Sequence, residues 1–362
     1  MSGQSAPGEY MLSAMKSKLD FFSYRLSTVI NSFKTLYTLP PEKVDAFLNS
    51  YEIYSHDWAN EKQLIQDLGT GYVKQVQQKL VDYYSVLNHL CALGQVEKMY
   101  IPPAMDLSKS IIANQKLFEK KMSQDLNLGK ESRVLDIGCG RGRVVHHMAS
   151  LSGAKVTGVN IDDDQLNAAR KFAAAKGFTK QCDFKKWNLN DLPFPFPDNH
   201  FDAIYHIQVF TYSKDLVKMC KELHRMMKPG GKFGCLDWVR LPKFNANDPY
   251  HAELMKRIKP LIGAIGTPSI DEYAGALREA GFEVLINENA SIDGLQAPLI
   301  DQADVFFTRI TKLVRFFVKC KVLPKHFNLL LDRLTKDGQA FVEADRARLV
   351  TTSHYIVAQK KK

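Results

Sequence analysis

A short apolar segment that runs directly into a glycine-rich turn constrains the fold more than any other feature of this sequence. Residues 134–142 read Val-Leu-Asp-Ile-Gly-Cys-Gly-Arg-Gly, which predicts a buried strand, a turn and then a helix. Glycine allows positive φ and lets a ligand approach the backbone closely. The spacing is G-x-G-x-G, whereas a dinucleotide-binding turn would need glycine at Arg143 and a phosphate-binding loop would be followed by lysine. The segment therefore predicts a ligand-binding turn of neither kind in an α/β sheet.

Short apolar runs alternate with helical patterns from residue 132 onward. We expect strands at residues 133–137, 155–159, 183–187, 202–206, 232–237, 283–287 and 353–358. This alternation predicts an α/β fold with a mostly parallel, Rossmann-like sheet covered by helices on both faces. We divide the chain into an N-terminal helical region (1–125), a core (126–289) and a C-terminal region (290–362) that ends in the last strand.

Residues 10–130 show helical spacing instead. The apolar residues of one predicted helical face are Met11, Met15, Leu19, Phe22, Leu26 and Phe33. Pro40-Pro41 breaks this run, and a second helix is expected to start near Glu42. Between the last two strands, residues 290–350 form an insertion with an apolar and basic stretch over 305–331.

Composition narrows the class of protein without identifying a partner. Of the 362 residues 45% are hydrophobic, enough for a sizeable core, and the net charge of +10 suits either an anionic partner or a merely soluble basic surface. No apolar run reaches the roughly 18 residues of a membrane span, and the N-terminus lacks the features of a signal peptide. The six cysteines are scattered without zinc-ligand spacing, so we expect reduced thiols, no metal site and a cytoplasmic location.

The glycine turn, with Asp136 on the strand before it, resembles the cofactor site of class I methyltransferases. In that class the turn holds the methionine end of S-adenosylmethionine. The resemblance implies this cofactor, and it implies contacts from Asp136, Gly138, Cys139, Gly140 and Gly142.

Three further segments lie at the distances that such a cofactor site requires. The second strand ends in Asn160, where an acid usually binds the ribose diol; an amide can still hydrogen-bond a hydroxyl, and Asp162 is the alternative ligand. Asn188 and Leu189 lie in a stretch that resembles the adenine-binding segment of these enzymes, with an amide in place of the usual aspartate. Residues 227–231 (Met-Lys-Pro-Gly-Gly) match the turn before the fifth strand, although alone they indicate only a helix stop.

Over residues 80–358 the chain resembles the sterol C-methyltransferases and their relatives that act on other isoprenoids. The resemblance is clearest at residues 157–160 (Thr-Gly-Val-Asn), 203–208 (Ala-Ile-Tyr-His-Ile-Gln) and 237–238 (Asp-Trp), and it continues through 244–281. It implies methyl transfer to a carbon of a sterol or related isoprenoid lipid. Residues 290–350 resemble the lipid-binding C-terminal region of that family.

The chain also departs from the family pattern. An aromatic-rich element normally follows a paired tyrosine, but here only Tyr83-Tyr84 and Gly94 match it. Gln208 and Tyr212 stand where the family has a glutamate and a histidine after the fourth strand, and Asn114 and Lys116 replace a histidine pair. These differences leave the exact substrate and the proton acceptor open.

The resemblance implies that a substrate alkene attacks the sulfonium methyl group and that the resulting carbocation loses a proton. Such chemistry needs alignment and a dry pocket with aromatic faces, not a metal or a covalent nucleophile. The catalytic candidates are Tyr84, Gln208, Tyr212 and Asp237. Asp237 and Tyr212 are the candidate bases, whereas Gln208 can hold a water or a hydroxyl and also contact the cofactor. Further aromatic candidates, for which ordinary core packing is the alternative, are Tyr83, Tyr205, Phe210 and Trp238.

Two other functions stay open: an N- or O-methyltransferase of a small molecule such as a phosphobase, alkaloid or phenol, and a non-catalytic protein that binds cofactor and lipid. We expect no nucleic-acid partner, because the motifs of adenine N6 and cytosine C5 methyltransferases are missing. A lipid substrate would bring peripheral contact with the endoplasmic reticulum membrane, through residues 305–317 or the helix around Phe22. Packing of both on the core is the alternative, and a homo-oligomer is left open.

Overall fold

The computed structural model describes residues 25–56, 61–93 and 98–362, without the side chains of residues 61–62 and 303–307. Its centre is a seven-stranded sheet in the order β3-β2-β1-β4-β5-β7-β6. The strands are β1 (Arg133–Ile137), β2 (Lys155–Asn160), β3 (Cys182–Lys186), β4 (Phe201–Ile207), β5 (Met227–Arg240), β6 (Phe282–Asn289) and β7 (Val350–Lys360). The first five pair in parallel, and β7 runs antiparallel between β5 and β6. The predicted α/β fold with a mostly parallel sheet is confirmed.

The seven strands lie where the sequence predicts them, and their ends differ by a few residues. The largest difference is at β5, which begins at Met227 and not at residue 232. Met227 pairs with Phe201 before the register shifts between Phe201 and Ala203, and Gly230 has φ +79°. The expected turn before this strand is therefore an irregularity inside the strand.

Helices cover both faces of the sheet. One face carries α5 (Ile111–Asp125), α6 (Arg143–Ser152) and α7 (Asp163–Ala175), and the other carries α8 (Leu216–Met226) and α10 (Ile270–Glu279). Side-chain caps start most of these helices: Ser110 for α5, Asp162 for α7, Asp215 for α8, and a capping box of Ser269 and Glu272 for α10. Because α5 packs on the sheet, part of the predicted N-terminal region belongs to the layered core.

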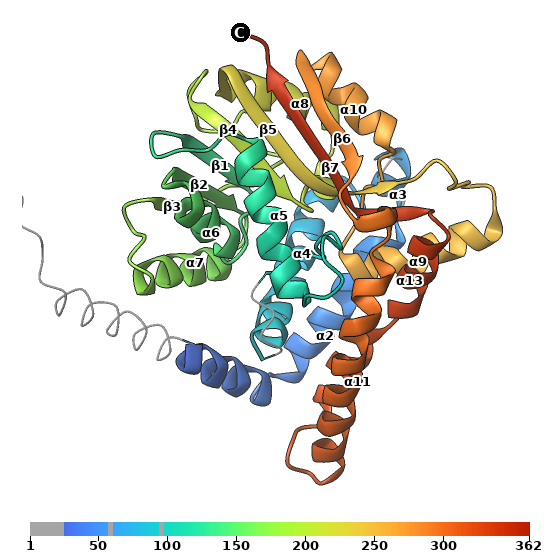
Figure 1. Cartoon of the computed structure of the whole chain (residues 1–362). Coiled ribbons are helices and arrows are strands. Elements are labelled where there is room, and N and C mark those ends of the chain that lie inside the picture. The colour runs from blue at the N-terminus through green and yellow to red at the C-terminus, as the bar shows by residue number, and fades with distance from the viewer. Residues whose placement is uncertain (1–24, 57–60, 94–97) are drawn as a thin grey trace, which may run out of the picture.

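The other helices gather mainly beyond the carboxyl ends of the parallel strands, below the sheet in Figure 1. They are a helix over 25–37, α2 (Pro41–Ser50), the short η1 (Tyr51–Ser55), α3 (Glu61–Leu68), α4 (Tyr72–Leu93), α9 (Pro249–Ile262), α11 (Ala297–Lys319), α12 (His326–Thr335) and α13 (Gly338–Arg346). The predicted break at Pro40-Pro41 is confirmed, with Pro41 in the first turn of α2. Residues 11–22 of the predicted N-terminal face lie outside the described residues.

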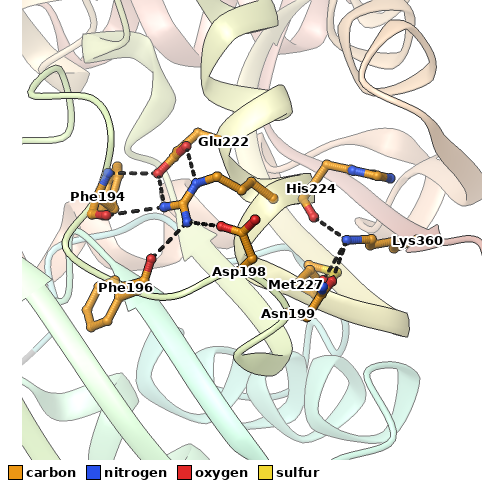
Figure 2. A network of polar contacts seen from close by, with 9 residues as sticks. Phe194, Phe196, Asp198, Asn199, Glu222, His224, Met227 and Lys360 are labelled. Atoms are coloured by element: carbon orange, nitrogen blue, oxygen red, sulfur yellow. Dashed lines mark hydrogen bonds and ion pairs between the residues drawn. The ribbon is translucent and has the colours of Figure 1, made fainter.

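An arginine on α8 fixes the long connection between β3 and β4 (Figure 2). Arg225 donates to the backbone oxygens of Phe194 at 3.2 Å and Phe196 at 2.9 Å, and it pairs with Asp198 at 2.6 Å and Glu222 at 2.6 Å. Since Asn188 and Leu189 lie in this connection, the network also supports one wall of the cavity described next.

Candidate active site

The described residues enclose a cavity of about 1210 Å³ at the carboxyl ends of β1, β2 and β4. Ligands bind at this edge in open α/β sheets. Ten of the residues predicted from the sequence line it: Tyr84, Asp136, Gly138, Cys139, Gly140, Asn160, Asn188, Leu189, Gln208 and Tyr212. Two others, Gly142 and Asp237, are not part of its wall.

The glycine turn owes its shape to packing at two of its three glycines. A Cβ on Gly138 would lie 2.5 Å from the Val209 side chain, and one on Gly142 would lie 2.7 Å from the Ala169 Cβ. Their φ angles are +73° and +71°. Gly140, at φ +51°, lines the cavity, and a Cβ there would meet only the Gln165 side chain at 3.2 Å. Gly140 is therefore the position where the backbone is open to a ligand.

Asp136 presents an unpaired carboxylate oxygen at the cavity wall. Its side chain is buried, and within the described part of the chain its Oδ2 has no hydrogen-bond partner. Burial raises the pKa of Asp136 well above its usual value, and the nearby Glu119 carboxylate adds to that effect. A bound cation would offset the effects of burial and of the Glu119 carboxylate and would favour the ionised form. The site therefore fits the ammonium group at the methionine end of S-adenosylmethionine.

A lysine that the sequence analysis did not single out brings the opposite charge to the same cavity. Lys98 lines it, and its Nζ lies 2.6 Å from Oε1 of the fully buried Glu119. Tyr100 Oη also donates to that carboxylate at 2.6 Å, and His147 Nδ1 lies 2.5 Å from it. Lys98 and Asp136 together match a zwitterion, so Lys98 is the residue that can hold the cofactor's carboxylate. It belongs to an irregular segment with no spacing signal, which is why motif analysis missed it.

Asn160 and Asp162 take different roles after β2. Asn160 lines the cavity, and its Nδ2 donates to Gln165 Oε1 at 3.0 Å. Asp162 is turned away, because its Oδ1 accepts the backbone N–H groups of Asp164 at 2.8 Å and Gln165 at 3.0 Å and caps α7. Asp162 is therefore a capping residue and not the alternative ribose ligand that we expected.

Asn188 and Leu189 lie in the wall on the other side of the turn. The Asn188 side chain folds onto its own segment: Oδ1 accepts from the Asn190 backbone N–H at 3.1 Å, and Nδ2 donates to Asp191 at 3.2 Å. Asn190 in turn donates to the backbone oxygen of Tyr212 at 2.9 Å. This connection joins the predicted adenine segment to the short helix η2 (Phe210–Tyr212), so the two walls are fixed relative to each other.

The side chain of Gln208 is committed to the protein itself. Its Nε2 donates to the backbone oxygens of Ile101 at 2.9 Å and Thr352 at 3.0 Å, and its Oε1 accepts from the Ile101 N–H at 3.3 Å. This corrects the expectation that the amide holds a water or a substrate hydroxyl, because both amide hydrogens are already used. Gln208 instead fastens the segment that carries Lys98 and Tyr100 to the sheet.

Asp237 belongs to a buried polar cluster behind the cavity. Tyr273 Oη lies 3.4 Å from Asp237 Oδ2 and 2.7 Å from His206 Nε2, while His206 Nδ1 lies 3.8 Å from Asp237 Oδ2. Burial raises the pKa of Asp237 to about 7 and lowers that of His206 to about 3. The Phe210 ring stacks on His206 at 3.8 Å and itself lines the cavity. The prediction of Asp237 as a base that touches substrate is wrong, because its side chain faces this cluster.

Two tyrosine candidates lie in the cavity wall. Tyr84 and Tyr212 line the cavity, and Tyr212 Oη lies 3.5 Å from Tyr54 Oη. Burial raises the pKa of Tyr212 well above its usual value, with the neighbouring Tyr54 and Tyr84 adding to it. The phenol of Tyr212 is therefore neutral. Of the four catalytic candidates, Tyr84 and Tyr212 thus lie together in the cavity wall. The Gln208 amide is bound to the protein backbone, and Asp237 lies outside the wall.

The remaining aromatic candidates pack in the interior. Tyr83, Tyr205 and Trp238 are buried outside the cavity wall, so their candidacy for its lining is wrong and the alternative of core packing holds, whereas Phe210 lines the cavity. Among the described residues, no three His, Cys, Asp or Glu side chains come together as metal ligands.

Comparison with known proteins identifies the core. Residues 135–235 match the family model described as a methyltransferase domain. A sterol 24-C-methyltransferase of Gibberella zeae is 29% identical over 265 residues, which cover 67% of this chain and 69% of that protein. The cycloartenol-C-24-methyltransferase of Arabidopsis thaliana is 26% identical, covering 77% of this chain and 85% of its own. With a sterol 24-C-methyltransferase of Aspergillus fumigatus, 30% identical, the match spans 56% of this chain and 50% of that protein.

Solved structures show the same fold. A geranyl diphosphate C-methyltransferase from Streptomyces coelicolor, crystallised with S-adenosyl-L-homocysteine, has a TM-score of 0.58 at 16% identity and covers 79% of this chain and 98% of its own. The [4+2]-cyclase SpnF reaches a TM-score of 0.61 at 19% identity over 79% of this chain and 97% of its own. Together with the glycine turn and the charges that fit the cofactor, these findings show an S-adenosylmethionine-dependent methyltransferase with the class I fold, and the curated relatives that it is similar to include sterol C-methyltransferases.

Proposed function

We propose that this enzyme transfers a methyl group to a carbon of a sterol or a related isoprenoid lipid. The observation that carries the proposal is the size and lining of the cavity beyond the glycine turn. Its volume of about 1210 Å³ exceeds the roughly 300–1,000 Å³ of an ordinary ligand pocket, as a cofactor and a second large molecule would require. The sterol methyltransferases among its relatives support the same substrate class.

The cavity wall away from the cofactor turn has a charged part, which includes Asp215, Arg240 and Glu272, and a part that is mainly apolar and aromatic. The apolar part is the one that would contact a lipid. Its side chains come from α3, α4 and η2: Leu64, Tyr72, Val73, Val76, Leu80, Tyr84, Phe210 and Tyr212. A lipid ring system would displace water from such a surface, whereas a small polar nucleophile would leave most of it uncovered.

When bound, S-adenosylmethionine supplies an electrophilic methyl group on a sulfonium centre. The chain's own contribution is to hold an alkene in line with that methyl group and to keep water out. As the alkene π electrons form the new C–C bond, the methyl–sulfur bond would break, its electron pair would leave with S-adenosylhomocysteine, and the positive charge would pass to the substrate as a carbocation. Tyr84, Phe210 and Tyr212 are aromatic residues of the cavity wall, and each aromatic face that such a charge met would contribute about 0.5–2 kcal/mol.

Tyr212 is the proton acceptor that the geometry favours. A C–H bond next to a carbocation is acidic enough for a neutral oxygen to accept its proton, so the raised pKa of Tyr212 is no obstacle. Loss of the proton returns the C–H electron pair to the substrate as a new double bond. Tyr54, 3.5 Å from the Tyr212 hydroxyl, is placed to share the proton. Asp237, the other base considered from the sequence, lacks access to the cavity.

The substrate class also suggests where the enzyme works. Sterols reside in membranes, so we propose a cytoplasmic protein in peripheral contact with the endoplasmic reticulum membrane. In the described part of the chain no helix is both long and apolar enough to cross a bilayer.

The test is to incubate purified protein with methyl-labelled S-adenosylmethionine and a panel of sterols and linear triterpenes, and then to extract neutral lipid. Label in the non-saponifiable fraction, with the carbon placed by mass fragmentation, is the expected result. Tyr212→Phe should lose most of the turnover while binding S-adenosylhomocysteine as before, and Tyr250→Phe, on an exposed tyrosine outside the cavity, should change neither. Label only in water-soluble products from a cell extract would replace the lipid substrate with a small nucleophile.

A further inference from the structure

Exposed apolar side chains are concentrated on the helices farthest from the sheet. Of the 18 large apolar side chains that are exposed in the described residues, nine lie on the helix over 25–37 or on the α11–α12 hairpin. They are Leu26, Ile30, Phe33, Tyr37, Leu313, Phe316, Phe317, Val322 and Leu329. The hairpin projects away from the sheet at the bottom of Figure 1. Isolated exposed apolar residues need no explanation, but a cluster of this size indicates an interaction surface.

α11 divides into three stripes along its length. Val314 and Val318 pack inward on a cluster with Phe327 and Leu330 of α12. At about 100° per residue, Leu313, Phe316 and Phe317 project to one side of this buried stripe, and they are 55%, 57% and 36% exposed. The third stripe holds the exposed basic residues Lys312, Arg315 and Lys319. A helix with separate apolar and basic outer stripes is typical of those that lie in the plane of a lipid interface.

The charge of the hairpin is strongly one-sided. Residues 309–336 contain eight Lys or Arg residues and one acid, Asp332. That single carboxylate pairs with Arg315 at 2.6 Å, so it neutralises one of the basic side chains. The others leave an excess of positive charge next to the exposed phenylalanines, which complements an anionic lipid surface and opposes association with a second copy of the same basic hairpin.

The helix over 25–37 continues the same surface. His326 Nε2 lies 2.7 Å from the backbone oxygen of Leu36, and the rings of Phe33 and Phe327 are 6.4 Å apart. These contacts fix the start of α12 against this helix. Leu36 is fully buried, whereas Leu26, Ile30, Phe33 and Tyr37 stay exposed.

We propose that the α11–α12 hairpin and the helix over 25–37 form one docking surface for an anionic phospholipid membrane. Leu313, Phe316 and Phe317 insert among the acyl chains at the interface, while Lys312 and Lys319 contact the lipid phosphates. This inference names the residues that would make the membrane contact proposed above. It rests on the proposed function only in that a lipid substrate explains why the enzyme would bind a membrane.

The direct test is sedimentation of the full chain with vesicles of phosphatidylcholine, with or without phosphatidylserine. The wild-type protein should bind the anionic vesicles more tightly, and added salt should weaken this binding. Leu313→Gln/Phe316→Gln and Lys312→Gln/Lys319→Gln should each weaken binding about tenfold or more. One matched control is Leu151→Gln, at an exposed leucine on α6. The other is Lys171→Gln/Lys180→Gln, at two exposed lysines on α7 and just before β3, the strand at one end of the sheet.

Docking and catalysis are then separated by presenting the substrate in two ways. The surface variants should keep full methyl transfer to a sterol solubilised in cyclodextrin and lose it for sterol embedded in anionic vesicles. Equal binding of wild type and surface variants would overturn the inference. The inference would also fail if light scattering showed that the wild-type protein is a dimer and the surface variants are monomers, while vesicle binding stayed unchanged. If no sterol is methylated in either form while vesicle binding still depends on these residues, the proposed function fails and the docking surface stands.

Discussion

Replacing Lys98 by methionine should weaken binding of S-adenosylhomocysteine through the amino-acid end of that ligand alone. The lysine ammonium lines the cavity and is held by Glu119, which is fully buried. A hydrogen bond to a charged group contributes roughly 1.5–3 kcal/mol. Loss of the contact to the cofactor's carboxylate should therefore raise the dissociation constant roughly 10- to 150-fold.

Calorimetry with two ligands isolates this effect. 5′-Methylthioadenosine shares the adenosine and the sulfur of S-adenosylhomocysteine but lacks the carboxylate, so Lys98→Met should hardly change its affinity. Asp136→Asn should show the same selectivity, because Asp136 is assigned to the ammonium group. Equal weakening of both ligands by Lys98→Met would mean that the lysine only shapes the pocket and would refute the assignment.

Folding has to be controlled, because the substitution leaves Glu119 without its lysine. Breaking a buried pair on one side costs about 3–5 kcal/mol, although Tyr100 and His147 still contact the carboxylate. The double variant Lys98→Met/Glu119→Leu removes both charges and should restore the thermal midpoint. It should keep the selective loss of S-adenosylhomocysteine, so a stability defect cannot be mistaken for a binding defect.

Three further predictions concern the scaffold. Asp237→Asn should gain stability relative to wild type as pH rises from about 4 to about 7, because the raised pKa of Asp237 makes its ionisation in the folded state unfavourable. His206→Gln should gain stability relative to wild type as pH falls below about 6.5, because the lowered pKa of His206 makes its protonation in the folded state unfavourable. Urea unfolding across pH measures both effects. Gly142→Ala should cost about 2–4 kcal/mol, from its φ of +71° and a Cβ placed 2.7 Å from Ala169, measured by thermal unfolding. Arg225→Met should lower the free energy of unfolding by about 2–4 kcal/mol, because the buried Glu222 loses its cationic partner and keeps only the Phe194 N–H.

Two positions serve as controls for these variants. Gly177 has φ +74° but no atom within 4 Å of an added Cβ, so Gly177→Ala should cost only the backbone strain of about 1 kcal/mol. Lys221 pairs with Glu279 on the surface, and Lys221→Met should change stability by about 0–1 kcal/mol. If Gly177→Ala cost as much stability as Gly142→Ala, the close contact assigned to Gly142 would be wrong. If Lys221→Met cost as much as Arg225→Met, the contacts assigned to Arg225 would be wrong.

The sheet could be predicted from the sequence because its signals are local. Each strand is a short apolar run between helical patterns, and the glycine turn follows β1 without interruption. The same logic could not choose the face of a side chain. In a sheet that is covered on both sides, apolar residues occupy both faces of a strand, so alternation does not show which side a polar residue such as Asp237 takes. Its position near the end of β5 suggested the cavity, but the structure places it with His206 and Tyr273.

The two halves of the site differ in how far apart in the sequence their parts lie, and this difference has a functional consequence. The cofactor half is mostly the glycine turn and the strand ends that follow it, where a change of one residue disturbs a shared backbone geometry. The lipid half is assembled from α3, α4 and η2, and Gln208 fastens the segment after α4 to β4 and β7. Side chains on a helix can change size without altering the turn that holds the cofactor. Substitutions at Tyr72, Val76 or Tyr84 should therefore change which lipid is methylated. The affinity for S-adenosylhomocysteine should stay unchanged in these variants, because it depends on Asp136 and Lys98.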